Sequence, residues 1–363
     1  MRGATSSIAP TKQNHAHFLY VIEGDARGRY FELDGAPFLI GRANGCHLRL
    51  ADDVVFKRHC MAQLEDDQLY VTDLNSTNGS YLNGTRIAGR SVWPNGKTLR
   101  LGRHEIRHEY RDRDEFTSSE QLAADLRRAS GYVASLLPQP ITAGAVQVDW
   151  CYAPSTVLGG DNFGYHWHGR DHFVFYLIDV CGHGVGSALH SVSVLNILRQ
   201  ESLVGADFKQ PADVLVRLNS AMQMESHGDM FFSIWYGVYN VVDRSLTFAS
   251  GGNPPAILLG GDGDPARELN TGGLFLGMLP NSEYTQQIQP IAPGSRLCVL
   301  SDGAFELTTE LGDEWSFQEL LKVVIQSAAE GTLSAGAIHQ KVKSVARHHA
   351  LDDDFSLMIL GFE

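Results

Sequence analysis

The sequence lacks the features that mark a membrane or secreted protein. No run approaches 18 consecutive apolar residues, and the N-terminus does not have the basic, apolar and small-residue order of a signal peptide. The five cysteines are odd in number and scattered, and they form no Cys-x-x-Cys pair, so neither a disulfide framework nor a zinc motif is indicated. We therefore expect a cytoplasmic protein with reduced thiols and no membrane partner.

Basic residues are also scarce. The 363 residues include 29 Lys and Arg against 42 Asp and Glu, which gives a formal net charge of −13. The deficit lies in residues 116–363, with 13 basic and 27 acidic residues, whereas residues 1–115 have 16 and 15. An acidic surface repels phosphate backbones and suits cations or basic partners, so we expect no nucleic-acid partner. The length predicts two or three domains.

The first part of the chain has the pattern of a β-domain. Four Asn-Gly dipeptides lie within residues 17–110, and none occurs elsewhere. Asn-Gly favours tight hairpins, because both central residues of a type I′ turn need positive φ. Short β-rich runs lie around them, at 18–22, 38–40, 68–74 and 80–84. This pattern predicts an antiparallel β-sandwich over 17–110.

Residues 111–140 form a linker with one amphipathic helix. A polar stretch, 111–120, precedes apolar positions with heptad spacing, and Pro138 and Pro140 end the pattern. The apolar positions are Leu122, Leu126, Ala129, Val133 and Leu136. Two interpretations stay open, a helix that packs on its own domain and a helix that forms a homodimer through 122–137.

The remainder, 141–363, mixes strands with amphipathic helices. Apolar strand-like runs lie at 173–178, 231–239, 296–300 and 355–362, and helical periodicity appears at 187–200, after Pro211, at 317–327 and at 335–347. This alternation predicts an α+β domain.

Acidic residues in this domain share one local context. Asp161 follows Gly159-Gly160, Asp179 closes a strand, Asp302 precedes Gly303, and 352–354 precede the last strand. Strand ends hold side chains rigidly, and the glycines allow close approach of backbone and ligand. If these ends share one edge, the converging carboxylates need hard cations to neutralise their repulsion, which indicates Mg²⁺ or Mn²⁺.

Six segments in chain order make residues 122–363 resemble a PPM-type metal-dependent protein phosphatase of the SpoIIE/RsbU-like bacterial branch. They are ASLLPQP (134–140), YAPSTVLGGDNF (152–163), IDVCGHGVGSAL (178–189), SGGNPPAILL (250–259), LSDGAFE (300–306) and DDFSLMIL (353–360). The resemblance implies a four-layer α-β-β-α sandwich with two metal ions. Asp161 and Asp179 would bind the metals, the Val180 carbonyl would add a backbone ligand, and Asp302 and Asp353 would complete the site.

Two departures from the family pattern are visible, since Gly164 stands where a further acid is common and SGGNPP lacks a common histidine. For such a site, two divalent ions would activate a water that attacks phosphorus directly. His183 has two open interpretations, a proton donor to the leaving oxygen or a residue that orients its turn.

Residues 17–110 resemble a forkhead-associated (FHA) domain through LIGR (39–42), KRHC (57–60) and DLNSTNGSYLNG (73–84). The resemblance implies a phosphothreonine site in which Arg42 bonds the phosphate and Thr77 and Asn78 grip the phosphate or peptide backbone. Phe56 replaces the usual phosphate-binding serine, and Lys57 could supply charge without its geometry. Phosphothreonine binding and a phosphate-independent protein dock both stay open.

Together these features predict a bacterial protein serine/threonine phosphatase that is targeted or regulated by its FHA domain. By resemblance, the substrate is a phosphoserine on a STAS-type anti-sigma-factor antagonist. The alternative is a scaffold that docks phosphorylated partners through a catalytically idle phosphatase fold.

Overall fold

The structure is a computed structural model that describes residues 14–261, 265–310 and 312–363. The chain divides into two compact units between Ala124 and Asp125, and each is described by itself. Within the described residues, no helix is both long and apolar enough to cross a membrane.

The N-terminal unit is a β-sandwich. Its six-stranded sheet has the order β2-β1-β11-β10-β7-β8, with β1 His15–Glu23, β2 Tyr30–Leu33, β7 Tyr81–Leu82, β8 Thr85–Arg86, β10 Thr98–Leu101 and β11 His104–Asp112. Its five-stranded sheet has the order β4-β3-β5-β6-β9, with β3 Phe38–Gly41, β4 Leu48–Arg49, β5 Cys60–Glu65, β6 Gln68–Asp73 and β9 Arg90–Val92. Buried side chains from both sheets, including Leu19, Ile40 and Trp93, form one core.

The turns of this unit differ from the expectation. Of the four Asn-Gly dipeptides, only Asn83-Gly84 has positive φ at both residues in a two-residue hairpin, between β7 and β8. The β5–β6 hairpin turns instead on Asp66 and Asp67, which both have positive φ. Strand β4 pairs with β3 in parallel, so the sandwich is not wholly antiparallel.

Helix α1, Arg113–Leu136, begins earlier than predicted and includes most of the polar stretch. It begins there because the Asp112 carboxylate accepts hydrogen bonds from the backbone N–H groups of Asp114 and Glu115. Phe116 is buried and stacks on Phe18 in the N-terminal unit, with ring centroids 4.1 Å apart.

The heptad positions of α1 do not share one environment. In the C-terminal unit, Val133 and Leu126 pack with Leu158 and Ala188, whereas Leu122 is 61% exposed.

The C-terminal unit contains two five-stranded sheets. One has the order β12-β23-β20-β17-β18, with β12 Val146–Ala153, β17 Ala256–Leu259, β18 Arg267–Leu269, β20 Arg296–Leu300 and β23 Phe355–Phe362. The other has the order β13-β14-β15-β16-β19, with β13 Asn162–His168, β14 His172–Val180, β15 Phe232–Asn240, β16 Ser245–Gly251 and β19 Gln287–Pro290. A short hairpin, β21 Leu307–Thr308 and β22 Glu314–Trp315, is separate from both.

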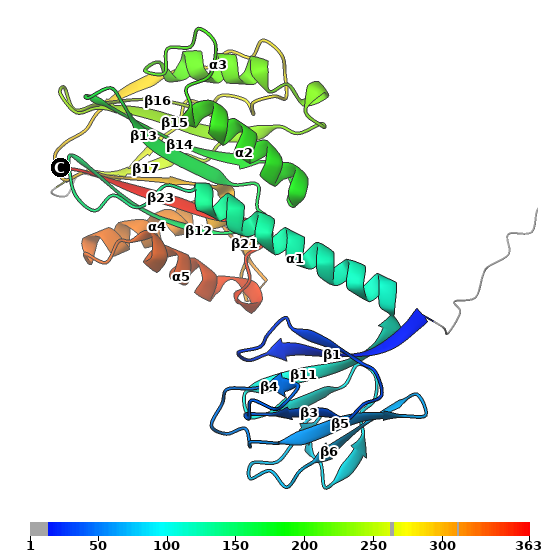
Figure 1. Ribbon diagram of the computed structural model, residues 1–363. Helices are drawn as coiled ribbons and strands as arrows, with labels where there is room; N and C mark the ends of the chain where they lie inside the picture. The colour runs from blue at the N-terminus through cyan, green and yellow to red at the C-terminus, as the bar shows by residue number, and fades with distance from the viewer. Residues whose placement is uncertain (1–13, 262–264, 311) are drawn as a thin grey trace, which may run out of the picture. The chain divides into compact units, whose positions relative to one another are not determined.

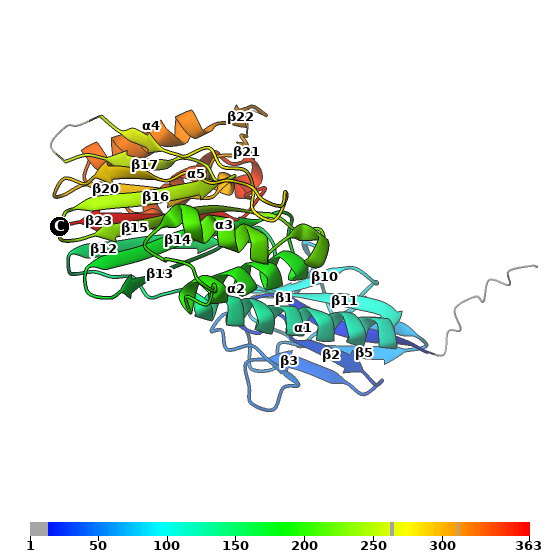
Figure 2. The same cartoon turned by 90° about the horizontal axis from the view of Figure 1, so that it is seen from above.

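Helices cover the outer face of each sheet (Figures 1 and 2). Helices α2 Val185–Arg199 and α3 Pro211–Ala221 pack on the β14–β15 sheet, and α4 Phe317–Ala329 and α5 Ala335–Val345 pack on the β20–β23 sheet. A third cluster of buried side chains fills the space between the sheets. Because both faces of the central strands are covered, β15 is buried along almost its whole length. The unit is the four-layer α-β-β-α sandwich that the resemblance implied.

Candidate active site

Four carboxylates lie at the same ends of strands from both sheets. Asn162 pairs with Ile178, so Asp161, just before β13, lies across from Asp179 near the end of β14. In the other sheet, Leu300 pairs with Leu357, which brings Asp302, just after β20, to the residues that precede β23. Asp353 belongs to that preceding segment.

The electrostatics of these carboxylates link them into one cluster. Burial and the charge of Asp179 raise the pKa of Asp161 well above its ordinary value. Burial and the charges of Asp302 and Asp353 raise the pKa of Asp179 to about 7. Burial and the charge of Asp353 raise the pKa of Asp302 to about 6. The charges of Asp179, Asp302 and Asp353 therefore disfavour ionisation of neighbouring carboxylates, as expected where a cation is to be held.

Glycines allow the backbone to close around this cluster. A Cβ on Gly160 would lie 2.6 Å from the carbonyl oxygen of Val180. A Cβ on Gly303 would overlap the backbone carbonyl of Asp354. Neither position accommodates a side chain, so these glycines are required by close approach rather than by turn geometry.

Asp354 has a role that the sequence did not reveal. It is only 3% exposed, and its carboxylate accepts hydrogen bonds from Ser155 N at 2.7 Å, Ser155 Oγ at 3.0 Å and Gly160 N at 2.6 Å. It thereby fixes the Gly159-Gly160 segment that carries Asp161 to the segment that carries Asp353. A single DDD run gives no indication of which carboxylate faces inward.

Asn253 is a second residue that sequence reasoning did not single out. Its side chain is buried, accepts a hydrogen bond from Ser233 Oγ at 3.1 Å and donates to the Leu300 carbonyl at 3.2 Å. Ser233 pairs with Asp179, and Leu300 lies two residues before Asp302. Asn253 therefore ties the two sheets together where their carboxylates lie. Its place in the SGGNPP segment was the available signal.

The residues present fit a divalent cation by donor chemistry. All four side chains offer hard oxygen ligands, and Oδ2 of Asp161 is, within the described chain, buried without a hydrogen-bond partner. Among the described residues, however, no three Asp, Glu, His or Cys side chains are arranged to hold one ion between them. Side chains at strand ends can change rotamer while the strands stay fixed, so the four carboxylates can turn toward a bound ion.

His183 lies between Gly182 and Gly184, which both have positive φ. Its side chain is exposed, and its charge acts on Asp353, where it opposes the rise in pKa that burial causes. The structure thus places His183 beside the cluster, and both of its interpretations stay open.

In the N-terminal unit, hydrogen bonds hold the predicted peptide-binding loops together. Arg42 N donates to the Phe56 carbonyl, and Asn78 Nδ2 donates to the Val54 carbonyl at 2.7 Å. His59 is fully buried, accepts from Phe56 N and contacts the Gly79 carbonyl at 3.2 Å. Burial lowers the pKa of His59, so its neutral ring braces the loops.

The side chains on these loops face solvent. Lys57 and Thr77 are exposed, and Phe56 is 44% exposed. The Arg42 guanidinium forms an ion pair with Asp53, with Nη1 2.6 Å from Oδ1. A phosphate group that reached Arg42 would compete with this carboxylate for the guanidinium.

Comparison with known proteins shows that each unit is similar to a known family. Residues 169–363, more than half of the chain, match the SpoIIE family, described as stage II sporulation protein E. Residues 38–102 match the FHA domain family.

Individual relatives follow the same division. The chain is 25% identical to the phosphoserine phosphatase RsbU of Bacillus subtilis over 251 residues, which covers 68% of this chain and 70% of RsbU. It is 36% identical to the FHA domain-containing protein FhaB of Mycobacterium tuberculosis over 98 residues, 27% of this chain and 63% of FhaB. The solved SiaA-PP2C domain of Pseudomonas aeruginosa aligns with a TM-score of 0.57 at 20% identity and covers 68% of this chain and 99% of that domain, so it supports the fold. The chain therefore belongs to the SpoIIE family of PP2C-type protein phosphatases and contains an FHA domain.

Proposed function

We propose that this protein hydrolyses phosphoserine or phosphothreonine on a signalling protein in a reaction that depends on Mg²⁺ or Mn²⁺. The observation that carries the proposal is the cluster of four carboxylates at matching strand ends of two sheets, in which Asp179, Asp302 and Asp353 raise the pKa of neighbouring members. The mutual repulsion of these carboxylates destabilises the fold unless bound cations neutralise their charge.

Asp161, Asp179, Asp302 and Asp353 would hold two ions, and the Val180 carbonyl would add a ligand. When bound, such ions lower the pKa of a coordinated water and neutralise phosphate charge. The protein's own contribution is to hold the carboxylates at fixed strand ends, with Asp354 and Asn253 bracing them. His183 lies where it could protonate the leaving oxygen.

For the substrate, we propose a phosphoserine on a STAS-type anti-sigma-factor antagonist. Support comes from the resemblance to RsbU, which is named a phosphoserine phosphatase. We place the protein in the cytoplasm, where its five free cysteines would stay reduced.

We propose that the FHA unit, residues 17–110, docks a phosphothreonine protein through Arg42, Lys57, Thr77 and Asn78. We further propose that it thereby targets or regulates the phosphatase unit, residues 141–363. The exposed Phe56 and the Arg42–Asp53 ion pair predict weak phosphate binding. A homodimer through 122–137 is supported by Leu122 and Tyr132, each 61% exposed on α1.

A second candidate is a catalytically idle scaffold that docks phosphorylated partners. It is favoured by one observation, namely that no three ligand side chains among the described residues are arranged to hold one ion. The presence of all four carboxylates of the cluster favours an active enzyme over the scaffold.

Phosphate release from p-nitrophenyl phosphate and from a phosphoserine peptide tests the proposal, with Mn²⁺, Mg²⁺ or EDTA present. We expect turnover that needs the metal and is abolished in Asp302→Asn. Asp171→Asn is the matched control, because this exposed residue lies in the turn at the opposite end of β14. Tight phosphopeptide binding without turnover under any metal would favour the scaffold.

A further inference from the structure

Two adjoining hollows open beside the carboxylate cluster. The first, about 500 Å³, is lined by residues from Phe305 to Thr308, by β22, by the start of α4 and by Asp352. The second, about 590 Å³, lies between the β21–β22 hairpin and helices α4 and α5. Glu314 and Trp315 line both hollows, so the two adjoin at β22, and together we call them the groove.

This groove begins at the cluster itself. Glu306, which lines the first hollow, donates its backbone N–H to the Asp302 carbonyl at 2.8 Å. Asp352, which directly precedes Asp353, accepts a hydrogen bond from Thr308 N at 3.3 Å. A chain lying in the groove would therefore pass directly beside the carboxylates.

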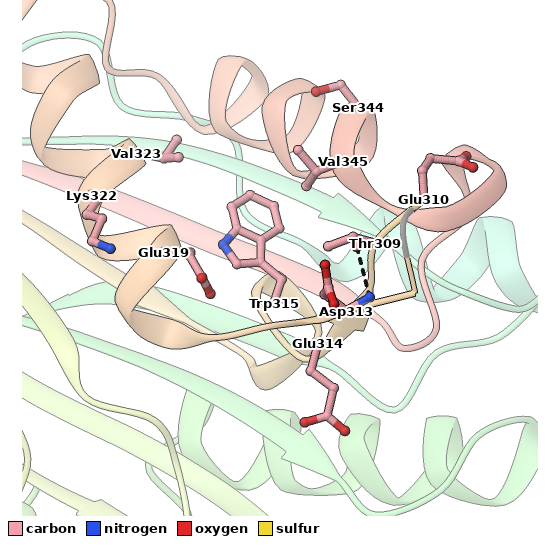
Figure 3. A pocket seen from close by; sticks show the side chains of 10 residues that line it. All are labelled: Thr309, Glu310, Asp313, Glu314, Trp315, Glu319, Lys322, Val323, Ser344 and Val345. Carbon is pink, nitrogen blue, oxygen red and sulfur yellow. Dashed lines mark hydrogen bonds between the residues drawn. The ribbon is translucent and has the colours of Figure 1, made fainter.

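The floor of the groove is apolar. Figure 3 shows the Trp315 ring between α4, which carries Lys322 and Val323, and Val345 of α5. Trp315 is only 8% exposed and belongs to the core under α4 and α5. In the first hollow, Phe305 and Phe317 pack edge to face with centroids 5.5 Å apart. Such a floor suits an apolar side chain.

The walls are acidic. Six carboxylates line the groove against one base, Lys322, whose charge acts on Glu319. The acids are Glu306, Glu310, Asp313, Glu314, Glu319 and Asp352. Several accept hydrogen bonds from neutral groups, as Glu319 does from Ser316 and Glu310 from His348 N. Across residues 14–261, 265–310 and 312–363, no ion pair involves any of the six, so the groove keeps its negative charge.

From this geometry we infer that the groove is the docking site for a basic segment of the phosphoprotein substrate, with Lys or Arg side chains against its walls and an apolar side chain over Trp315. The inference deepens the proposed function and rests on it. Charge complementarity selects the occupant, because an acidic segment or a lipid headgroup phosphate would be repelled. The groove then distinguishes protein substrates from small phosphate esters, which need only the cluster.

The experiment uses the full chain and two fluorescent phosphoserine peptides of equal length. One has Lys, Arg and Leu near the phosphoserine, and the other has Glu in place of Lys and Arg. Binding by fluorescence anisotropy requires no turnover, and KM is measured in parallel with Mn²⁺ present. The test variant is Asp313→Lys combined with Glu314→Lys, both exposed and outside the cluster. The control is Asp171→Lys together with Asp243→Lys, exposed turn residues with the same change of charge.

We expect the basic peptide to bind at least tenfold more tightly than the acidic one at low salt, and the test variant to lose about tenfold of that affinity while the control loses little. Turnover of p-nitrophenyl phosphate should be unchanged in the test variant. Replacing the peptide Leu by Ser should weaken binding about threefold or more if the floor is used. Equal binding of both peptides, or equal losses of affinity in the test and control variants, would overturn the proposed docking role of the groove. Loss of p-nitrophenyl phosphate turnover in every protein, with peptide binding retained, would instead contradict the proposed activity.

Discussion

Replacing Asp354 by Asn should destabilise the C-terminal unit although Asp354 is not among the proposed ligands. One carboxylate oxygen accepts from Ser155 N and Oγ, and the other accepts from Gly160 N. An amide offers only one oxygen, so at least one buried backbone N–H would face an NH₂ group. The variant therefore tests whether this carboxylate is the brace that we describe.

The magnitude follows from that mismatch. A hydrogen bond to a charged acceptor contributes about 1.5–3 kcal/mol, and a buried donor left unsatisfied costs about 1–3 kcal/mol. Their sum, about 2.5–6 kcal/mol, is reduced by relief of repulsion with Asp161, whose pKa the Asp354 charge helps to raise. A net loss of about 3 kcal/mol should lower Tm by about 6–12 °C in a unit of this size.

The assay is thermal unfolding by differential scanning calorimetry in EDTA, so that metal binding does not contribute. The matched control is Asp353→Asn, one residue earlier and exposed. Its pKa is raised in the folded unit, so neutralising it should leave Tm unchanged or raise it, while phosphatase activity is lost. If Asp354→Asn unfolds at the wild-type temperature, the proposed bracing role is wrong.

Three further predictions concern other parts of the chain. Burial lowers the pKa of His108 to about 4, so the stability that depends on its neutral ring should be complete above pH 6.5 and decrease by up to about 3 kcal/mol as the pH falls to 4. Urea unfolding should show that wild type loses up to about 3 kcal/mol more than His108→Gln over this pH range. Asp53→Ala should tighten binding of a phosphothreonine peptide about twofold to fivefold by releasing Arg42, measured by calorimetric titration, and an unchanged affinity would show that the Arg42–Asp53 ion pair does not oppose phosphate binding. Gly303→Ala should lower both Tm and phosphatase activity, because its Cβ would overlap a backbone carbonyl, whereas Gly131→Ala, with open space around it, should raise Tm slightly.

Much of the C-terminal fold was predictable, because its long apolar strands and periodic helices are strong local signals. The sequence expectation for 355–362 coincides with β23, and that for 296–300 coincides with β20. The positions of Asp161 and Asp302 at strand ends also followed from their glycine neighbours. The inward orientation of Asp354 did not, since it depends on Ser155 and Gly160, about 200 residues away in sequence.

The turns of the N-terminal unit were less predictable from local sequence. Asn83-Gly84 forms the expected hairpin, but Asp66-Asp67 forms another without an Asn-Gly dipeptide, where β5 pairs with β6. The start of α1 was missed since charged residues indicate both linkers and exposed helix surface. The buried Phe116 was the distinguishing signal.

The position of β23 has a consequence for how the protein is made. This strand, Phe355–Phe362, lies between β12 and β20, and Val146 pairs with Phe362. A ribosome must therefore synthesise the chain through residue 362 before the first sheet of the C-terminal unit can close. Asp353 and Asp354 arrive with the same segment, so the carboxylate cluster cannot assemble until that segment has been synthesised. The FHA sandwich, complete by residue 112, can fold while that synthesis continues.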